Sequence, residues 1–161
     1  MKVSSRTKQI KTVVYAKINP VFGALIHIVM AFVLGRLFPL PLAVPPVLQT
    51  IGFLIVILGF LLGIAALTAF RRARPTRDSE ALVVRLVTFG IYRFTRNPVY
   101  LGFLLMLIGV PLNAGSYWGI ILTPVMVSLF NRFVIEPEEE NLSRKFGDEY
   151  INYKAKVRRW L

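Results

Sequence analysis

Apolar residues along this chain fall into long unbroken runs rather than the short periodic segments of a water-soluble domain. Residues 47–70 contain no ionisable side chain, and residues 20–38 contain only His27 and Arg36. Both runs reach the length that a helix needs to cross about 30 Å of hydrocarbon. The pattern therefore predicts two membrane-spanning helices within residues 20–70, joined by a proline-rich connector that cannot stay helical.

Two further apolar runs follow a basic stretch that we assign to a cytoplasmic loop, residues 71–97. The run 99–112 has only 14 residues, about 21 Å of helix, which is too short to span comfortably. The run 116–135 is long enough. We therefore predict a helical hairpin over residues 98–135, in which the first helix either draws its polar start into the membrane or pairs tightly with the second.

The last segment, residues 136–161, is polar but carries an apolar stripe. Leu142, Phe146, Tyr150 and Tyr153 recur at helical spacing, which predicts an amphipathic cytoplasmic helix that folds onto the membrane or over a polar site. The whole chain, 1–161, is thus expected to be a single all-α domain of a polytopic membrane protein. It has about four transmembrane helices, the last two as a hairpin, followed by this C-terminal helix.

The formal net charge of +12 fits this arrangement. Of the 20 Lys and Arg residues, five precede residue 20, seven lie in 71–96 and seven in 132–159. Basic residues concentrate on the cytoplasmic side of membrane proteins, so we predict a basic N-terminal segment, residues 1–19, and both termini in the cytoplasm. We expect an integral protein of a bacterial inner membrane, in contact with the lipid bilayer. Nucleic-acid binding is not expected, because no aromatic–basic readout motif is present, and nothing in the sequence indicates the oligomeric state.

Several residues of the apolar runs have structural explanations. Gly59 and Gly63 form a small-xxx-small pair, which lets two helices approach closely. The only histidine, His27, lies inside the first run, where an imidazole is more often bonded to a neighbouring helix than catalytic. The chain has no cysteine, which excludes thiolate metal sites and a cysteine nucleophile. No metal site is expected, and the candidate chemistry lies in two polar clusters at the ends of the hairpin.

The first cluster, Arg96-Asn97-Pro98, opens the hairpin. Asparagine followed by proline is the favoured N-cap and first-turn pair of a helix, so capping alone could explain Asn97. A functional role is the alternative, because a helix start presents N–H groups and a partial positive charge that can hold a carboxylate or phosphate. Arg93 and Arg96 add to that charge.

The second cluster lies where the hairpin ends. Asn131 and Arg132 come at the end of a span, where polar side chains are costly unless they pair or line a cavity. Pro137 followed by Glu138 and Glu139 is typical of the first turn of a new helix. A glutamate suits a ribose diol or an ammonium group, and an arginine suits a carboxylate. S-adenosylmethionine carries all of these groups and is the expected cofactor.

From Thr88 to the C-terminus the chain resembles the isoprenylcysteine carboxyl methyltransferase-like proteins, and the related phospholipid methyltransferases share much of the pattern. The residues that carry the resemblance, in order and spacing, are Gly90-Ile91-Tyr92-Arg93, Arg96-Asn97-Pro98-Val99-Tyr100-Leu101-Gly102, Asn131-Arg132, Glu138-Glu139, Leu142, Phe146-Gly147-Asp148-Glu149-Tyr150, Tyr153 and Val157. The family's motif usually reads Arg-His-Pro, and Asn97 stands in the place of that histidine.

The resemblance implies a helical membrane enzyme that binds S-adenosylmethionine at the cytoplasmic ends of the last two helices, with the C-terminal helix closing over it. A lipophilic acceptor would enter from the bilayer. The expected cofactor-binding residues are Tyr92, Arg96, Asn97, Pro98, Tyr100, Leu101, Gly102, Glu138 and Glu139. Asn131 and Arg132 are the expected catalytic residues, with Arg132 in contact with the acceptor or with the reacting end of the cofactor.

Methyl transfer from a sulfonium asks little of side chains beyond aligning the reactants and excluding water. A carboxylate acceptor is ionised at neutral pH, whereas an amine must first lose a proton. We therefore expect a lipophilic or membrane-associated acceptor that presents a carboxylate or a lipid head group. Two other classes remain open: an NADPH-dependent intramembrane reductase of the sterol-reductase type, which shares a similar C-terminal motif, and a non-enzymatic membrane scaffold.

Overall fold

The computed structural model describes residues 20–73 and 86–161, and its regular elements there are all helical. In chain order they are α1 (Pro20–Leu37), α2 (Pro46–Arg72), the 3₁₀ turn η1 (Gly90–Arg93), α3 (Pro98–Asn113), α4 (Trp118–Phe130), the π-helical turn η2 (Asn131–Ile135), α5 (Glu136–Phe146) and α6 (Asp148–Lys156). The all-α prediction is confirmed. The N-terminal segment 1–19 and residues 74–85 of the basic loop lie outside the described residues.

Within residues 20–73 and 86–161, three helices are long and apolar enough to cross a membrane: Pro20–Leu37, Pro46–Arg72 and Trp118–Phe146. The shorter apolar helix α3 has 16 residues. Large apolar side chains, such as Phe22 on α1 and Phe60 on α2, are exposed along these helices, as expected where the surroundings are hydrocarbon and not water. The chain is an integral membrane protein, and its described part has three span-length helices where the sequence predicted about four.

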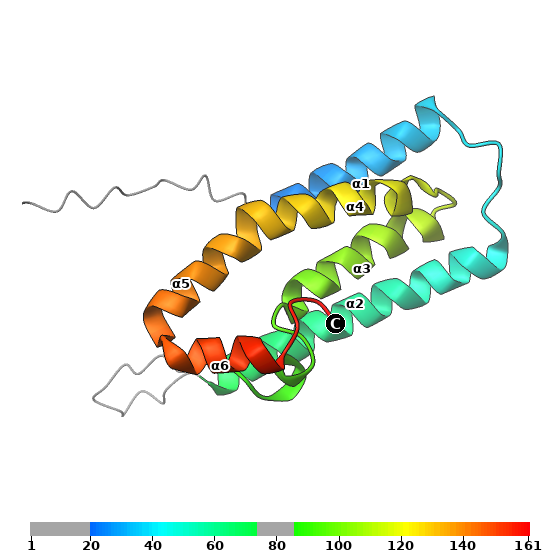
Figure 1. The fold of residues 1–161 in the computed structure, drawn as a ribbon. Coiled ribbons are helices and arrows are strands. Elements are labelled where there is room, and N and C mark those ends of the chain that lie inside the picture. Colours follow the sequence, from blue (N-terminus) through cyan, green and yellow to red (C-terminus); the bar gives the residue numbers. More distant parts are fainter. Residues whose placement is uncertain (1–19, 74–85) are drawn as a thin grey trace, which may run out of the picture.

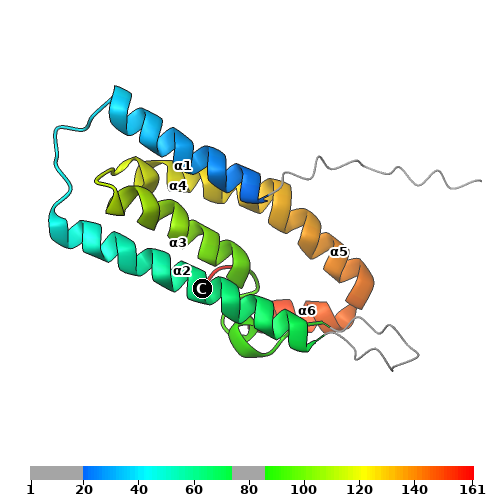
Figure 2. The same cartoon turned by 180° about the vertical axis from the view of Figure 1, so that it is seen from behind.

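Helix α3 lies at the centre of the bundle, with α2 along one side and α1 and α4 on the other (Figures 1 and 2). Glycines bring α2 and α3 into backbone contact: a Cβ added to Gly59 would lie 2.7 Å from the carbonyl oxygen of Gly102. A Cβ added to Gly109 would meet the carbonyl oxygen of Gly52 at the same distance. The backbone N of Gly63 lies 3.5 Å from a Cβ added to Gly102, so both glycines lie at the close contact, but a Cβ at Gly63 itself would meet nothing within 4 Å.

The buried apolar core lies on the other side of α3. It consists of Ala24, Leu104, Leu107, Met126, Phe130, Val134 and Ile135, with Trp160 packed against it. His27 is also buried among α1, α3 and α4, and it lines neither of the cavities described below. The contact of Trp160 with this core means that the C-terminal tail returns into the bundle.

The helices α4, η2 and α5 form one continuous helix (Figure 1). The N–H of Glu136 bonds to the carbonyl of Asn131, five residues earlier, so the join is π-helical. Pro137 accounts for the distortion, because it has no N–H to donate to the turn before it and its ring crowds that turn. Pro137 does lie in the first turn of α5, as the sequence predicted, but that turn continues the π-helical turn and starts no separate helix. Glu138 and Glu139 lie inside a helix that has already begun.

The single C-terminal helix predicted over residues 136–161 is divided at Gly147. This residue has φ 52° and ψ −127°, a backbone conformation in which a side chain is strained. α5 ends at Phe146, and α6 turns back along the end of the bundle (Figure 1). After Lys156 the chain reaches the start of α3, where the N–H of Arg96 donates to the carbonyl of Arg158 at 3.0 Å. The break therefore directs the tail into the bundle.

Candidate functional site

A cavity of about 700 Å³ lies where α2 ends, α3 begins, and α5 and α6 fold back. We call it the candidate-site cavity, and its volume is within the range of small-molecule sites. Of the eleven residues expected at the site, seven line it: Tyr92, Arg96, Asn97, Pro98, Tyr100, Glu138 and Glu139. The predicted apolar stripe of Leu142, Phe146, Tyr150 and Tyr153 lines it too. The two polar clusters therefore do meet at one cavity.

The other four expected residues do not line this cavity. Gly102 faces Gly59 across the α2–α3 contact, and Leu101 beside it is half-buried. Asn131 is connected to the site indirectly, since its Oδ1 accepts a hydrogen bond from Nη1 of Arg159 at 3.4 Å. Arg132 is exposed on the surface. The catalytic roles expected for Asn131 and Arg132 remain predictions.

Glu139 is the centre of a buried ionic cluster. Its carboxylate lies 3.0 Å from Nη1 of Arg96, 2.9 Å from Nη2 of Arg159 and 3.5 Å from Nζ of Lys154. The Nε of Arg159 also donates to the other carboxylate oxygen at 3.2 Å, so this pair is bidentate. The hydrogen bond to Glu139 raises the pKa of Arg159 above its ordinary value. One carboxylate thus joins the start of α3, α6 and the C-terminal tail.

Arg96 is the most enclosed cation of the cluster, with 8% of its side chain exposed. Its Nη1 also donates to the hydroxyl of Tyr150 at 3.4 Å. Its Nε is buried and finds no hydrogen-bond partner among the described residues. An unsatisfied buried donor costs about 1–3 kcal/mol, and this side chain lies in the wall of the cavity.

Glu138 faces the same cavity and is partnered by Tyr100, whose hydroxyl donates to Oε1 at 2.8 Å. Burial, followed by the charge of Glu138, raises the pKa of Tyr92. Burial likewise raises the pKa of Tyr153, and the Tyr153 hydroxyl donates to the carbonyl of Tyr92 at 2.7 Å. These phenols therefore stay protonated at neutral pH and act as hydrogen-bond donors.

Asn97 precedes α3, but its side chain makes no capping hydrogen bond. Its Nδ2 donates to the carbonyl of Arg159 at 3.0 Å. The hydroxyl of the fully buried Thr95 donates to the same carbonyl at 3.2 Å and accepts from the N–H of Asn97 at 3.1 Å. The capping interpretation is therefore wrong, and Asn97 holds the C-terminal tail in place.

Three residues that complete the site were not identified from the sequence: Thr95, Lys154 and Arg159. Arg159 follows Glu139 by 20 positions, and in the sequence it is one of several basic residues near the C-terminus. Its only signal was its charge, which it shares with its neighbour Arg158. The turn at Gly147 is what brings it back to Glu139.

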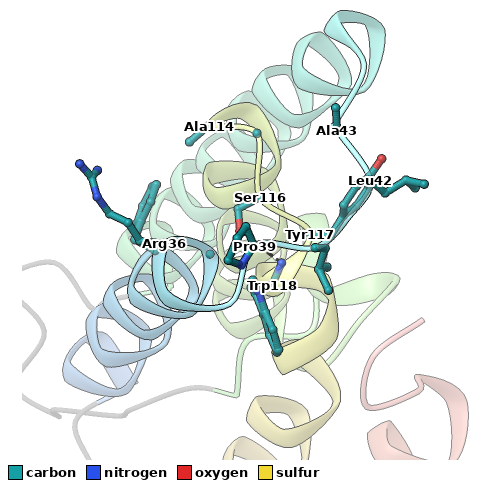
Figure 3. Close-up of a pocket in the computed structure, with 12 residues that line it drawn as sticks. Arg36, Pro39, Leu42, Ala43, Ala114, Ser116, Tyr117 and Trp118 are labelled. Atoms are coloured by element: carbon teal, nitrogen blue, oxygen red, sulfur yellow. Dashed lines mark hydrogen bonds between the residues drawn. The ribbon is translucent and has the colours of Figure 1, made fainter.

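A second cavity, of about 310 Å³, lies at the other end of the bundle, between the connector after α1 and the α3–α4 turn (Figure 3). The indole of Trp118 donates to the carbonyl of Phe38 at 3.0 Å, and the hydroxyl of Ser116 donates to the carbonyl of Ala31 at 3.4 Å. Arg36 points away from Ser116 and Trp118 (Figure 3). These contacts fasten the connector to the bundle, and the chemically distinctive residues lie at the opposite end.

Comparison with known proteins matches residues 47–149 to a family described as phospholipid methyltransferase. This range contains every residue expected at the site. The chain is also similar to an uncharacterized protein of Haemophilus influenzae, with 44% identity over 66 residues that cover 39% of this chain and 100% of the relative. No solved structure matches the chain.

Two relatives have named activities. A protein-S-isoprenylcysteine O-methyltransferase of Schizosaccharomyces pombe is 36% identical over 72 residues, covering 45% of this chain and 30% of the relative. Methanethiol S-methyltransferase 1 of Bradyrhizobium diazoefficiens is 35% identical over 78 residues, covering 48% of this chain and 26% of the relative. The chain thus spans less than a third of the length of either named methyltransferase.

Proposed function

Because the chain belongs to the phospholipid methyltransferase family, we propose that it is an S-adenosylmethionine-dependent methyltransferase acting on a lipophilic or membrane-associated acceptor. The membership confirms the resemblance that the sequence suggested. The observation that carries the proposal is a single cavity that combines a polar end, with Arg96, Tyr100 and Glu138, and an apolar wall. The family match favours neither the reductase nor the scaffold alternative.

The polar side chains of the cavity suit the groups of the cofactor. The guanidinium of Arg96 can hold the carboxylate, and charge-assisted pairs of this kind are strong. Glu138, with its partner Tyr100, can hold the ammonium group or the ribose hydroxyls, while Leu142 and Phe146 offer apolar surface to the adenine. When bound, S-adenosylmethionine supplies a methyl group on a positively charged sulfur.

The remaining residues of the site hold the proposed cofactor-binding side chains in position. The ionic cluster around Glu139 ties α5 and α6 to the start of α3, and Asn97 fixes the tail behind it. Leu101 and Gly102 act on the cofactor indirectly, by seating the first turns of α3 against α2. A rigid, enclosed site serves methyl transfer by holding the reactants in line and excluding water.

The acceptor that fits this site best is a carboxylate. The described part of the cavity has no histidine, and burial raises the pKa of Tyr92, Tyr150 and Tyr153, so tyrosinate is scarce at neutral pH. An amine acceptor must first lose its proton, and the two carboxylates of the cavity, Glu138 and Glu139, are already bonded to Tyr100 and to Arg96 and Arg159, whereas a carboxylate acceptor arrives ionised. A lipid head group is the second candidate. Asn131 and Arg132 remain the residues proposed to contact the acceptor.

Titration of the purified protein by calorimetry tests the cofactor assignment. We expect saturable binding of S-adenosylmethionine and none of NADPH. Transfer of a radiolabelled methyl group is then measured with N-acetyl-S-farnesylcysteine as the carboxylate acceptor and phosphatidylethanolamine vesicles as the amine acceptor. Binding of NADPH, or of neither cofactor, would overturn the proposed function.

A further inference from the structure

Gly63 has no explanation in the conformation or the packing of α2. It lies one turn after Gly59 on the same face, yet a Cβ there would meet nothing within 4 Å. It is inside a regular helix and is not among the described glycines with positive φ. A glycine in a helix interior costs about 1 kcal/mol relative to alanine. Something other than fold stability therefore accounts for the missing side chain.

The space beside Gly63 is the candidate-site cavity. The backbone N of Gly63 still lies 3.5 Å from a Cβ added to Gly102, but from Gly63 onwards this face of α2 forms the wall of the cavity, with Gly63, Ala66, Leu67 and Phe70. No side chain of this wall can form a hydrogen bond. The wall is therefore poorly suited to the carboxylate, the ammonium group or the ribose of the cofactor, and well suited to hydrocarbon.

The same wall is open on the bilayer side. Leu67 is 48% exposed and Phe70 is 47% exposed, and both belong to a helix that is apolar and long enough to cross the membrane. A hydrocarbon chain that follows α2 can thus enter the cavity with its head group directed toward the polar end, where the cofactor is proposed to bind. Such an amphipathic molecule matches both ends of the cavity.

We propose that Gly63 makes room for the hydrocarbon chain of the methyl acceptor and sets the bulk of the chain that the site admits. The inference rests on the proposed function and assigns one part of the acceptor to one wall of the site. It makes Gly63 a specificity-determining residue of α2. Gly59, one turn earlier, is a packing residue.

The test compares Gly63→Leu with Ile64→Phe, a matched control that adds bulk to the adjacent residue, which is 44% exposed and outside the cavity. Gly63→Ala adds less bulk and is included because it keeps the test usable if the leucine variant does not fold. Each protein is titrated with S-adenosylmethionine, and kcat/KM is measured with N-acetylcysteine derivatives carrying S-geranyl, S-farnesyl and S-geranylgeranyl chains.

We expect Gly63→Leu to bind S-adenosylmethionine within about threefold of the wild type while kcat/KM for the longest chain falls by about tenfold or more. The loss should be smaller for the shortest chain, and Ile64→Phe should behave like the wild type. A parallel loss of cofactor affinity would place the cofactor at this wall and overturn the inference. Unchanged chain-length selectivity would overturn it as well.

A second measurement does not depend on which acceptor is turned over. The chain has no cysteine, so Gly63→Cys carries one thiol, which is labelled with bimane in vesicles of brominated phospholipid. Ile64→Cys provides the lipid-exposed control and Phe130→Cys, 1% exposed, the buried control. Quenching at residue 63 close to that at residue 64 supports the inference, and quenching as low as at residue 130 refutes it. If the wild-type protein does not bind S-adenosylmethionine, the proposed function is refuted instead.

Discussion

The side-chain amide of Asn97 donates a hydrogen bond to the main-chain carbonyl of Arg159, 62 positions later in the chain. The guanidinium of the same Arg159 donates hydrogen bonds from two nitrogens to the carboxylate of Glu139. The tail is therefore held by its backbone to the start of α3 and by its side chain to α5. The two residues that hold the tail, Asn97 and Glu139, both line the cavity.

Replacing Asn97 tests whether its role is to hold the tail. Asn97→Asp puts a carboxylate where a donor faced a carbonyl, so we expect a loss of about 1–2 kcal/mol in unfolding free energy and faster digestion of the tail by carboxypeptidase. Asn97→His can keep an N–H donor and should resemble the wild type. Asn113→Asp serves as the control, because Asn113 donates to the carbonyl of Gln49 at the other end of the bundle. Equal digestion of the Asn97→Asp variant and the wild type would contradict this assignment.

Removing the charge of Glu139 should destabilise the site as a unit. Glu139→Gln leaves the buried guanidinium of Arg96 without its counter-ion, and breaking a buried ion pair on one side costs about 3 kcal/mol. We expect a clearly lower midpoint of thermal unfolding and weaker binding of S-adenosylmethionine. Glu149→Gln, on the exposed face of α6, is the charge-matched control and should change neither quantity. A Glu139→Gln protein as stable as the wild type would show that the cluster contributes little.

The proposed carboxylate contact is tested by Arg96→Lys. Lysine keeps the positive charge opposite Glu139 but has neither the planar fork nor an Nε donor in the same place. We therefore expect the Kd for S-adenosylmethionine to rise about tenfold or more while the unfolding midpoint stays near that of the wild type. Arg158→Lys is the control, because Arg158 is exposed and its guanidinium donates to the carbonyl of the terminal Leu161, away from the cavity lining. Unchanged affinity in Arg96→Lys would remove Arg96 from the cofactor site.

Substitutions of Glu138 and of its hydrogen-bond partner Tyr100 should lower the affinity for S-adenosylmethionine to different extents. Glu138→Ala removes the carboxylate proposed to hold the ammonium or ribose group, so calorimetry should show cofactor affinity about tenfold lower or more. Tyr100→Phe removes only the hydroxyl that donates to Glu138, and a smaller loss is expected. Glu140→Ala, on the same helix and exposed, provides the control. If Tyr100→Phe proved more damaging than Glu138→Ala, the phenol itself would be the contact.

The helical class, the membrane segments and most of the cavity lining could be predicted from the sequence, because each depends on local pattern. A run with no ionisable side chain identifies α2, and a run that contains only His27 and Arg36 identifies α1. The spacing of Leu142 and Tyr150 identifies the face of α5 and α6 that meets the cavity. Arg96 and Glu138 could be predicted as site residues because charged side chains at the end of an apolar run are costly unless they pair or line a cavity.

The contacts that complete the site could not be predicted, because they depend on how distant segments meet. Asn97 and Pro98 carry a strong local capping signal, yet the amide bonds to Arg159, which no local pattern connects to it. Pro137 carries an equally strong helix-start signal and lies in the first turn of α5, but the sequence did not show that a π-helical turn joins α5 to α4 without a break. Gly59 and Gly63 look equivalent in the sequence, but a Cβ at Gly59 would meet the carbonyl oxygen of Gly102 on α3, whereas a Cβ at Gly63 would meet nothing within 4 Å.

The π-helical turn at Asn131–Ile135 also sets the direction, around the helix axis, in which the side chains of α5 point. Each residue of an α-helix advances the chain by about 100° around its axis, so the extra residue held in this turn rotates α5 relative to the register of α4. Deleting one residue here and restoring a regular helix would swing Glu138 and Glu139 roughly a quarter-turn away from Arg96. The length of this five-residue segment is therefore more tightly constrained than its composition. A variant shortened by one residue would keep its membrane-spanning helix, but Glu139 would no longer face Arg96.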